Sequence, residues 1–445
     1  MKAGNMLIKD GKVFSFPNNT DNLSKIKTID ARGLICMPGI VDIHTHFRLK
    51  LGEHNYNSDD FESGTKAALS CGITCVADFT DQDPGDSFLS GIKKRIKDAK
   101  KSYCDYSFHC IVPSFSKMKN FSLEVKKAAD SGAFTFKIFT AYSKRGLMLS
   151  SREIRQMLKE AKRNKAAVFV HAEKEEDIEK NSLKYANLKK KNPMKAFPFI
   201  RSEVTELNAV KEVIKLNEDI KAKLYFVHIS SPLSAAEIKK ASERMPVRAE
   251  TCPQYLIFSD KIYSKKDAYL YSCCPPVRSP NASLKLWDFL NKGVLSAVST
   301  DSCGFSVKMK KSWGGDLDKL YMGISSAQFL FPLIYTFGVR KKRITLERLK
   351  ALCCENPAKF AGFSKKGFLK KGYDADFFLF DPKECFFVSK KSLLNSCGYS
   401  VYEGFKLWGK VKKVFLRGKI AYDGGKVFKP MGAYVKRTPP FFNSR

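Results

Sequence analysis

Eight short apolar segments, each followed by a helical pattern, constrain the fold of this chain more than any other feature. The candidate strands are Val41–His46, Ile73–Phe79, Tyr106–Val112, Phe134–Thr140, Ala166–Ala172, Ala222–Ile229, Val247–Thr251 and Leu295–Thr300. Helical patterns fill the gaps, among them Ser63–Ser70, Ser87–Ser102, Ser151–Asn164, Glu203–Leu216 and Ser234–Glu243. Eight strands alternating with helices over about 300 residues predict an α/β fold of the (β/α)₈ TIM-barrel type.

Both ends of the chain carry further strand patterns. They are Met6–Ile8 and Lys12–Phe16 at the start, and Asp376–Phe380, Lys410–Leu416 and Lys419–Tyr422 near the end. Strands from the two ends can pair, so we expect a small β-sandwich domain beside the barrel. The predicted division is 1–38 and 364–430 for the sandwich, 39–363 for the barrel and 431–445 for a C-terminal tail.

The first strand of the predicted barrel ends in two histidines at alternate positions. His44 and His46 therefore project from one face of the strand, where two imidazoles can bind one divalent cation. Such a tripeptide proves little alone, so further ligands are needed. In a barrel they would come from the C-terminal ends of other strands. Three residues of suitable chemistry lie at such ends: His171, His228 and Asp301.

The two remaining histidines have other interpretations. His54 falls in the loop after the first strand, and His109 lies inside the third strand pattern. For His109 we favour a hydrogen-bonded packing role over metal ligation.

Lys137 lies inside the apolar strand Phe134–Thr140, where an unpaired ammonium would be very costly. Taken alone, a snorkelling or ion-paired lysine is the favoured interpretation. Beside metal ligands a second chemistry becomes available. A neutral amine, its pKa lowered by burial and nearby cations, can add CO₂ to give a carbamate with two oxygens that can bridge two metals.

Several segments, in order along nearly the whole chain, form a specific combination. They are PGIVDIHTHF (38–47), FESGTKAAL (61–69), FKIFTAY (136–142), VHAE (170–173), VHISS (227–231), ETCPQYL (250–256), CCPPVR (273–278), STD (299–301), ENPAKFAG (355–362), DADFFLFDP (374–382) and YEGF (402–405). The combination resembles the dihydropyrimidinase/D-hydantoinase family of the amidohydrolase superfamily. The resemblance implies two divalent metal ions, usually zinc, bridged by carboxylated Lys137. It assigns one ion to His44, His46 and Asp301, and the other to His171 and His228.

The implied activity is the opening of dihydropyrimidine or hydantoin rings to N-carbamoyl amino acids. A hydroxide shared by the metals would attack the ring amide carbonyl. The Tyr142 hydroxyl would stabilise the oxyanion, and Asp301 would carry the proton from water to the leaving nitrogen. The resemblance also implies a small-molecule cyclic amide as substrate and a homo-oligomer, either a tetramer or a dimer.

The chain differs from that family at the positions that are expected to contact the substrate. The implied substrate-binding residues are Tyr142, Cys274, Met322 and Arg48. Cys274 stands in place of a serine and Met322 in place of an asparagine, so contacts through backbone atoms can survive while side-chain specificity is open. Ser302 replaces a common histidine. Arg48 has the spacing of an arginine that grips a substrate carboxylate in dihydroorotases, although a solvated loop arginine is the competing interpretation.

Three functions therefore remain open. The first is a cyclic amidohydrolase acting on dihydropyrimidines or hydantoins. The second, favoured by Arg48 and the altered pocket, is an allantoinase- or dihydroorotase-like cyclic ureide hydrolase. The third is a non-enzymatic scaffold, whose mark would be the loss of metal ligands. Every ligand position is filled here.

The formal net charge of +34 raises the question of nucleic-acid binding. Basic runs such as Lys93–Arg95 and Lys189–Lys191 are spread along the chain in patterns typical of exposed helix faces, and no nucleic-acid motif accompanies them. We therefore expect a solvated basic surface and no nucleic-acid partner. The sequence has no apolar run long enough for a membrane span and no signal-peptide pattern, which together with 13 unpatterned cysteines predicts a cytoplasmic protein.

Overall fold

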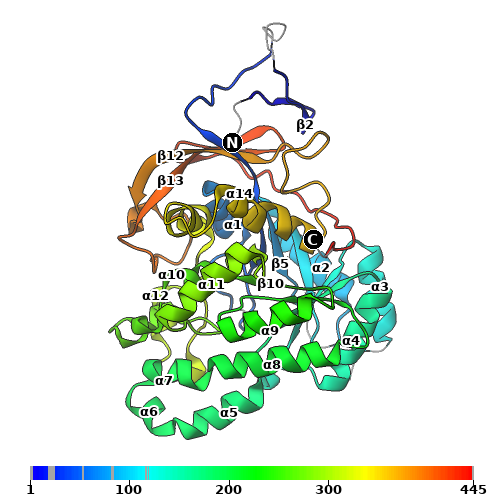
Figure 1. Cartoon of the computed structure of the whole chain (residues 1–445), viewed down its shortest axis with the longest axis vertical. Coiled ribbons are helices and arrows are strands. Elements are labelled where there is room, and N and C mark those ends of the chain that lie inside the picture. Colours follow the sequence, from blue (N-terminus) through cyan, green and yellow to red (C-terminus); the bar gives the residue numbers. More distant parts are fainter. Residues whose placement is uncertain are drawn as a thin grey trace.

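The computed structural model describes residues 4–18, 26–52, 55–81, 85–115, 118 and 120–442, and its centre is an eight-stranded parallel sheet that curls into a nearly closed barrel (Figure 1). The strands, in spatial order, are β4 (Ile40–Thr45), β5 (Ile73–Phe79), β6 (Asp105–Ile111), β7 (Thr135–Phe139), β8 (Ala167–His171), β9 (Lys223–Phe226), β10 (Val247–Thr251) and β11 (Ala297–Val298). A bridge between Thr45 and Ser302 joins the two edges of the sheet. The predicted barrel is confirmed.

Helices surround this sheet. The longer ones are α1 (Phe61–Ser70), α2 (Phe88–Asp98), α3 (Phe121–Asp130), α4 (Ser151–Arg163), α5 (Glu175–Lys184), α7 (Pro193–Ile200), α8 (Glu203–Leu216), α9 (Pro232–Ser242) and α11 (Pro280–Lys292). The short ones are α6 (Ala186–Lys191), α10 (Pro253–Ile257), α12 (Val307–Lys311), α13 (Leu330–Ile334), α14 (Leu346–Lys350) and α15 (Asn356–Ala361). Among the described residues, no helix combines the length and apolarity needed to cross a bilayer.

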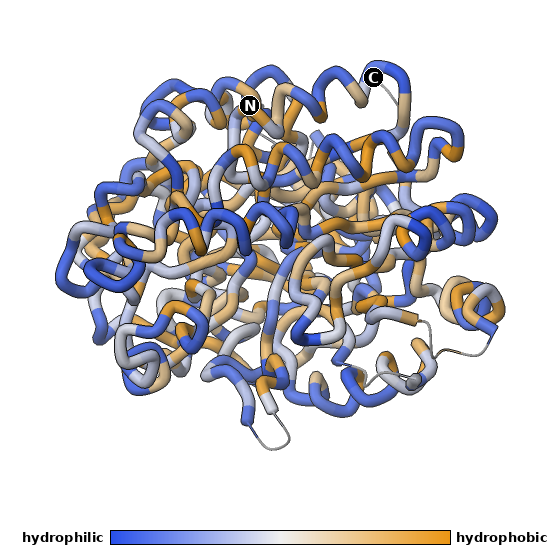
Figure 2. The backbone as a smooth tube through the Cα atoms, turned by 90° about the horizontal axis from the view of Figure 1, so that it is seen from below, coloured by the Kyte–Doolittle hydropathy of each residue, from blue (hydrophilic) through white to orange (hydrophobic). Residues whose placement is uncertain are grey.

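Side chains alternate across each barrel strand, as the period of two requires. In β7, Phe136 and Ile138 point outward and pack in the cluster beneath the helices. Lys137 lies between them and therefore faces the barrel interior. Phe169 and Tyr225 belong to a separate interior cluster. Figure 2 shows the result along the chain, with hydrophilic residues on the outer turns of the helices and hydrophobic residues gathered inside.

Two barrel strands are shorter than the sequence pattern suggests. Most residues of Ala222–Ile229 are apolar, but β9 ends at Phe226, and the predicted strand 295–300 is reduced to the two residues of β11. The reason lies just beyond each strand, where His228 and Asp301 adopt left-handed backbone conformations with φ of 39° and 50°. A residue in this region of backbone space leaves the extended ladder.

The small domain lies above the barrel in Figure 1 and draws its strands from both ends of the chain. Its antiparallel sheet has the order β15 (Lys426–Val427), β14 (Lys419–Asp423), β13 (Lys406–Leu416), β12 (Phe377–Phe387) and β3 (Ile35–Pro38). The predicted N-terminal strands do form, as β1 (Leu7–Lys9) and β2 (Lys12–Ser15), but they pair with each other. The N-terminal strand that enters the larger sheet is β3, which the sequence pattern missed. Val13, Phe377 and Phe415 pack between the two sheets.

A buried ionic cluster joins the small domain to the barrel. The Lys366 ammonium lies 2.5 Å from Asp105 at the start of β6, and 2.9 and 2.7 Å from Asp374 and Asp376 next to β12. Only 2% of the Lys366 side chain is exposed. Arg417, in the turn between β13 and β14, also contacts Asp105. The cluster therefore connects the barrel strand directly to the small sheet.

The predicted C-terminal tail returns to the barrel over its described part, 431–442. Tyr434 bridges to Tyr106 near the start of β6. Arg437 is buried and donates a hydrogen bond to Thr135 Oγ1 at 2.6 Å. Phe442 is 4% exposed and packs in the interior cluster, with its ring centroid 6.2 Å from that of Tyr225. The tail thus covers the amino-terminal end of the barrel, opposite the predicted site.

Candidate active site

The paired histidines of the first barrel strand meet the predicted aspartate. Nε2 of His44 and Nε2 of His46 each lie 3.2 Å from Oδ1 of Asp301, which follows β11. Within the described part of the chain, these three residues form the one group of at least three His, Cys, Asp or Glu side chains whose ligand atoms lie within 4.8 Å of one another. His44 lies on β4 and His46 directly follows its last residue, and both imidazoles face Asp301, on one side of the chain as predicted.

A second pair of histidines lies beside this group. Nδ1 of His171, at the end of β8, is 2.9 Å from Nε2 of His228, two residues beyond β9. The rings of His44 and His228 are 5.3 Å apart between centroids, so the two pairs are adjacent. All four predicted histidines therefore gather at the C-terminal mouth of the barrel.

Lys137 projects into the same space from β7. Its Nζ is fully buried and has no hydrogen-bond partner among the described residues. It lies 5.4 Å from the centroid of the Phe79 ring and 5.3 Å from that of Phe139. Burial lowers the pKa of Lys137, which favours the neutral amine. An orphaned amine among metal-binding side chains fits the carbamate predicted from the sequence.

Two buried carboxylates, not assigned from the sequence, orient the histidines from behind. Glu250 on β10 lies 2.6 Å from Nδ1 of His44 and accepts a hydrogen bond from the Tyr225 hydroxyl at 3.0 Å. Glu173 lies 2.9 Å from Nε2 of His171. A carboxylate only accepts, so each histidine presents its other ring nitrogen, unprotonated, to the centre of the site. Both residues stand in segments of the family resemblance, VHAE and ETCPQYL, which was the available signal.

The electrostatics of the mouth suit a divalent cation. Burial lowers the pKa of His44 and of His228 well below the usual value, so both imidazoles are neutral. Burial opposes ionisation of Asp301, but its polar interactions with the His44 and His46 imidazoles outweigh this effect and lower its pKa. Neutral imidazoles with an ionised carboxylate are the ligands that zinc prefers in open sites.

Tyr142 stands at the edge of the metal-binding residues, in the loop after β7. Its ring centroid is 5.1 Å from that of His171, and its hydroxyl lies near Cys274. The Arg201 guanidinium lies 5.3 Å from the centroid of the Tyr142 ring and also pairs with Glu173 at 2.5 Å. Tyr142 and Cys274 are thus brought together at the mouth, with Arg201 as a neighbour that the sequence did not single out.

Met322 lies in a loop attached to the same region. The next residue, Gly323, donates its N–H to the carbonyl of Ser272 at 2.9 Å, two residues before Cys274. Cys303, two residues after Asp301, donates its N–H to the carbonyl of Ile324 at 3.1 Å. The segments that carry Cys274, Asp301 and Met322 are therefore hydrogen-bonded to one another.

Arg48 is already engaged with protein groups. Its Nε lies 3.2 Å from Asp98 on α2, and its guanidinium lies 4.3 Å from the centroid of the Tyr56 ring. This ion pair competes with the predicted grip on a substrate carboxylate. Of the remaining histidines, His109 has the expected packing role, with Nδ1 2.7 Å from the Thr135 hydroxyl and Nε2 2.9 Å from the Ile43 carbonyl. His54 lies outside the described residues.

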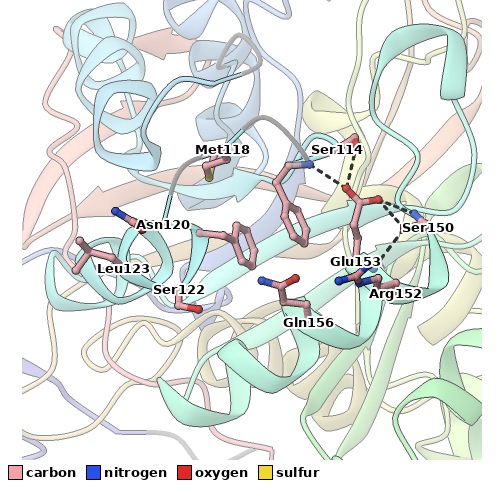
Figure 3. A pocket seen from close by; sticks show the side chains of 11 residues that line it. Ser114, Met118, Asn120, Ser122, Leu123, Ser150, Arg152, Glu153 and Gln156 are labelled. Atoms are coloured by element: carbon pink, nitrogen blue, oxygen red, sulfur yellow. Dashed lines mark hydrogen bonds between the residues drawn. The ribbon is translucent and has the colours of Figure 1, made fainter.

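A separate pocket of about 920 Å³ opens between the loops that precede α3 and α4 (Figure 3). Glu153 organises it, accepting hydrogen bonds from the Ser114 hydroxyl at 2.9 Å and the Phe115 N–H at 3.0 Å. None of its described lining residues belongs to the metal-binding set. We therefore take the converging ligand atoms, and not this hollow, as the functional site.

The barrel, together with the histidines, lysine and aspartate at its mouth, defines a hydrolase of the amidohydrolase class. A sequence model of the Amidohydrolase family matches residues 35–421, and the chain belongs to that family. It is 32% identical over 441 residues to a D-hydantoinase of Ralstonia pickettii, a match that covers 97% of this chain and 94% of that protein. It is 29% identical to a D-phenylhydantoinase of Escherichia coli O9:H4, covering 98% and 94%. The crystal structure of dihydropyrimidinase from Brevibacillus agri superimposes with a TM-score of 0.93 at 30% identity, covering 98% and 96%.

Proposed function

We propose that this protein is a metal-dependent cyclic amidohydrolase that opens dihydropyrimidine or hydantoin rings to N-carbamoyl amino acids. The observation that carries the proposal is the convergence of four imidazoles and one aspartate around one orphaned lysine amine. Relatives named for action on such rings support the choice of substrate class.

Two divalent ions, with zinc as the expected metal, would be held by this set. His44, His46 and Asp301 would bind one ion; His171 and His228 would bind the other. Lys137 would bridge them after its neutral amine adds CO₂ and releases a proton to form the carbamate. Bound ions of this kind activate water and polarise a carbonyl oxygen.

Asp301 would transfer the proton during the reaction, and Tyr142 would stabilise the negative charge that develops on the carbonyl oxygen. Asp301, ionised at neutral pH, accepts the proton of the attacking water and returns it to the leaving ring nitrogen. The Tyr142 hydroxyl donates a hydrogen bond to the carbonyl oxygen as that oxygen gains negative charge. Glu250 and Glu173 hold the histidine tautomers throughout, as carboxylates behind metal-bound histidines do.

The alternative of an allantoinase- or dihydroorotase-like enzyme depends mainly on Arg48. In the structure that guanidinium is paired with Asp98 and would have to leave it to bind a substrate carboxylate. The non-enzymatic scaffold is disfavoured because each predicted ligand is present and directed to the mouth. We also propose a cytoplasmic homo-oligomer, which light scattering and cell fractionation would test.

The deciding experiment is a hydrolysis screen of the zinc- and bicarbonate-loaded protein. It includes dihydrouracil, hydantoin, phenylhydantoin, allantoin and dihydroorotate, with His228→Ala as the control for contaminating activity. We expect ring opening of dihydrouracil or a hydantoin by the wild type alone. Turnover restricted to allantoin or dihydroorotate would favour the alternative enzyme, and no turnover of any ring would favour the scaffold.

A further inference from the structure

Another buried lysine, which the proposed chemistry does not use, lies beside the segments that carry Cys274 and Met322. Lys310 on α12 has no exposed surface, and its aliphatic stem and ammonium pack beside Phe305, with Nζ 5.7 Å from the ring centroid. Burial lowers its pKa to about 8, and the titratable groups that act most on it are the thiols of Cys273 and Cys303. Burying an ammonium is costly unless it is paired and hydrogen-bonded, so its partners matter.

Within the described part of the chain, the hydrogen bonds of this ammonium go to one residue, Ser272. Nζ of Lys310 donates to the carbonyl of Ser272 at 3.1 Å and to its hydroxyl at 2.7 Å. The Ser272 carbonyl also accepts the Gly323 N–H at 2.9 Å. The Ser272 hydroxyl shares its one proton between the carbonyl of Tyr269 at 2.9 Å and the carbonyl of Tyr321 at 3.1 Å. Lys310 therefore connects, through Ser272, the segment before Cys274 with the loop on both sides of Met322.

This connection is rigid because the loop has no room to move toward the metal-binding residues. A Cβ on Gly323 would lie 2.5 Å from the carbonyl oxygen of Cys303, so only glycine permits this approach. The bridge from Ser302 to Ile324 fixes the loop on its far side. The backbone of Met322 is thus held on one side by Lys310, through Ser272, and on the other side by the segment that follows Asp301.

A fixed backbone geometry matters here because the side chains at the two proposed substrate-contacting positions can give little substrate specificity. A cysteine and a methionine stand at 274 and 322, and neither offers the strong donors and acceptors with which a ring amide is recognised. Recognition of the ring amide would then depend on the backbone N–H and C=O groups of the two segments. A lysine ammonium has three hydrogen-bond donors, so Lys310 can hold both segments in place through Ser272. An apolar side chain has no donor for this.

We propose that Lys310 is a positioning residue that holds the Cys274 and Met322 backbones in the geometry that binds a cyclic amide ring. The inference rests on the proposed ring-opening function.

The test compares Lys310→Met with Lys311→Met, the exposed neighbour on the same helix. KM and kcat for the best ring substrate, zinc content and Tm are measured for each. Interactions that hold the ring equally in the ground state and the transition state act on KM alone. We therefore expect KM to rise about tenfold in Lys310→Met, with kcat and zinc content close to wild type. Lys311→Met should match the wild type. Ser272→Ala, which removes only the shared hydroxyl, should raise KM in the same direction and decides the question should Lys310→Met fail to fold.

The outcomes separate this inference from the function on which it rests. Wild-type turnover with the KM of Lys310→Met and Ser272→Ala equal to that of Lys311→Met would overturn the positioning role alone. A fall in kcat and zinc content at unchanged KM would also overturn it, since Lys310 would then support the metals. A wild-type protein that opens none of the rings would remove the proposed function and this inference together.

Discussion

Individual residues at the barrel mouth adopt backbone conformations that most side chains avoid. Tyr142, His228 and Asp301 have φ of 71°, 39° and 50°. Each such conformation costs on the order of 1 kcal/mol or more and persists only where the surroundings impose it. All three residues have a proposed role in ligation or carbonyl binding. At these three positions the strained backbone directs a side chain into the site.

Tyr142 is the residue whose contribution is easiest to isolate. Tyr142→Phe keeps the ring beside His171 and removes only the hydroxyl. If that hydroxyl stabilises the developing oxyanion, kcat should fall about 10²- to 10³-fold, as for other single donors in such sites. Steady-state kinetics with parallel zinc analysis measure the effect. A kcat within a few-fold of wild type at full zinc content would leave Tyr142 a packing residue.

A substitution of Arg48 tests whether positive charge in the loop after β4 determines which ring substrates are preferred. A freed guanidinium could grip an acidic ring substituent bidentately, a geometry that lysine cannot reproduce. We expect the wild type to favour rings with small, polar or acidic groups over phenyl- or isopropyl-hydantoin, and Arg48→Leu to shift this preference toward apolar rings at unchanged metal content. The ratio of kcat/KM values between the two substrate classes is the measurement. An unchanged ranking would mean that Arg48 serves only its ion pair with Asp98.

At the scale of elements, the barrel and most of the site could be predicted because their signals are local. The strands β5 and β10 have the predicted bounds, and strand alternation alone placed His44 and His46 on one face. Contacts between side chains that are hundreds of positions apart leave no such local pattern in the sequence. Glu250 lies 206 positions from His44, and the role of Lys310 depends on loops that meet only in the folded barrel. Strand β3 was missed because its four residues are stabilised by pairing with β12, far along the chain.

The C-terminal tail is another element whose place follows from long-range contacts. Phe442 is buried inside the barrel floor, whereas its neighbour Phe441 is 53% exposed. Phe442→Ala should therefore destabilise the protein by about 3 kcal/mol, the lower end for a buried phenylalanine. Phe441→Ala, the matched control, should change the free energy of unfolding by less than about 0.5 kcal/mol. Urea unfolding measures both. Equal effects of the two substitutions would mean that the tail does not seal the floor in solution.

At the scale of the whole molecule, Lys366 couples the small domain to the barrel. Removing its charge leaves the buried Asp105 and Asp376 and the partly exposed Asp374 close together without the ammonium that they share. In urea unfolding, Lys366→Met should cost about 3–5 kcal/mol, as expected when one partner of a buried ionic cluster is lost. Lys12→Met is the control, because Lys12 is half exposed and contacts Asp374 at the surface, where a pair is worth about 1 kcal/mol or less. A Lys366→Met protein as stable as Lys12→Met would show that the cluster does not hold the domains together.

The central claim is that the residues at the barrel mouth form a two-metal site that opens cyclic amides. A zinc titration of the metal-free protein in bicarbonate buffer, followed by ring-opening activity, tests it most directly. The account predicts that activity rises to a plateau at about two zinc ions per chain, and that Lys137→Ala neither retains the zinc nor becomes active. Full activity with no metal, a plateau at one ion per chain, or an active Lys137→Ala protein would contradict it.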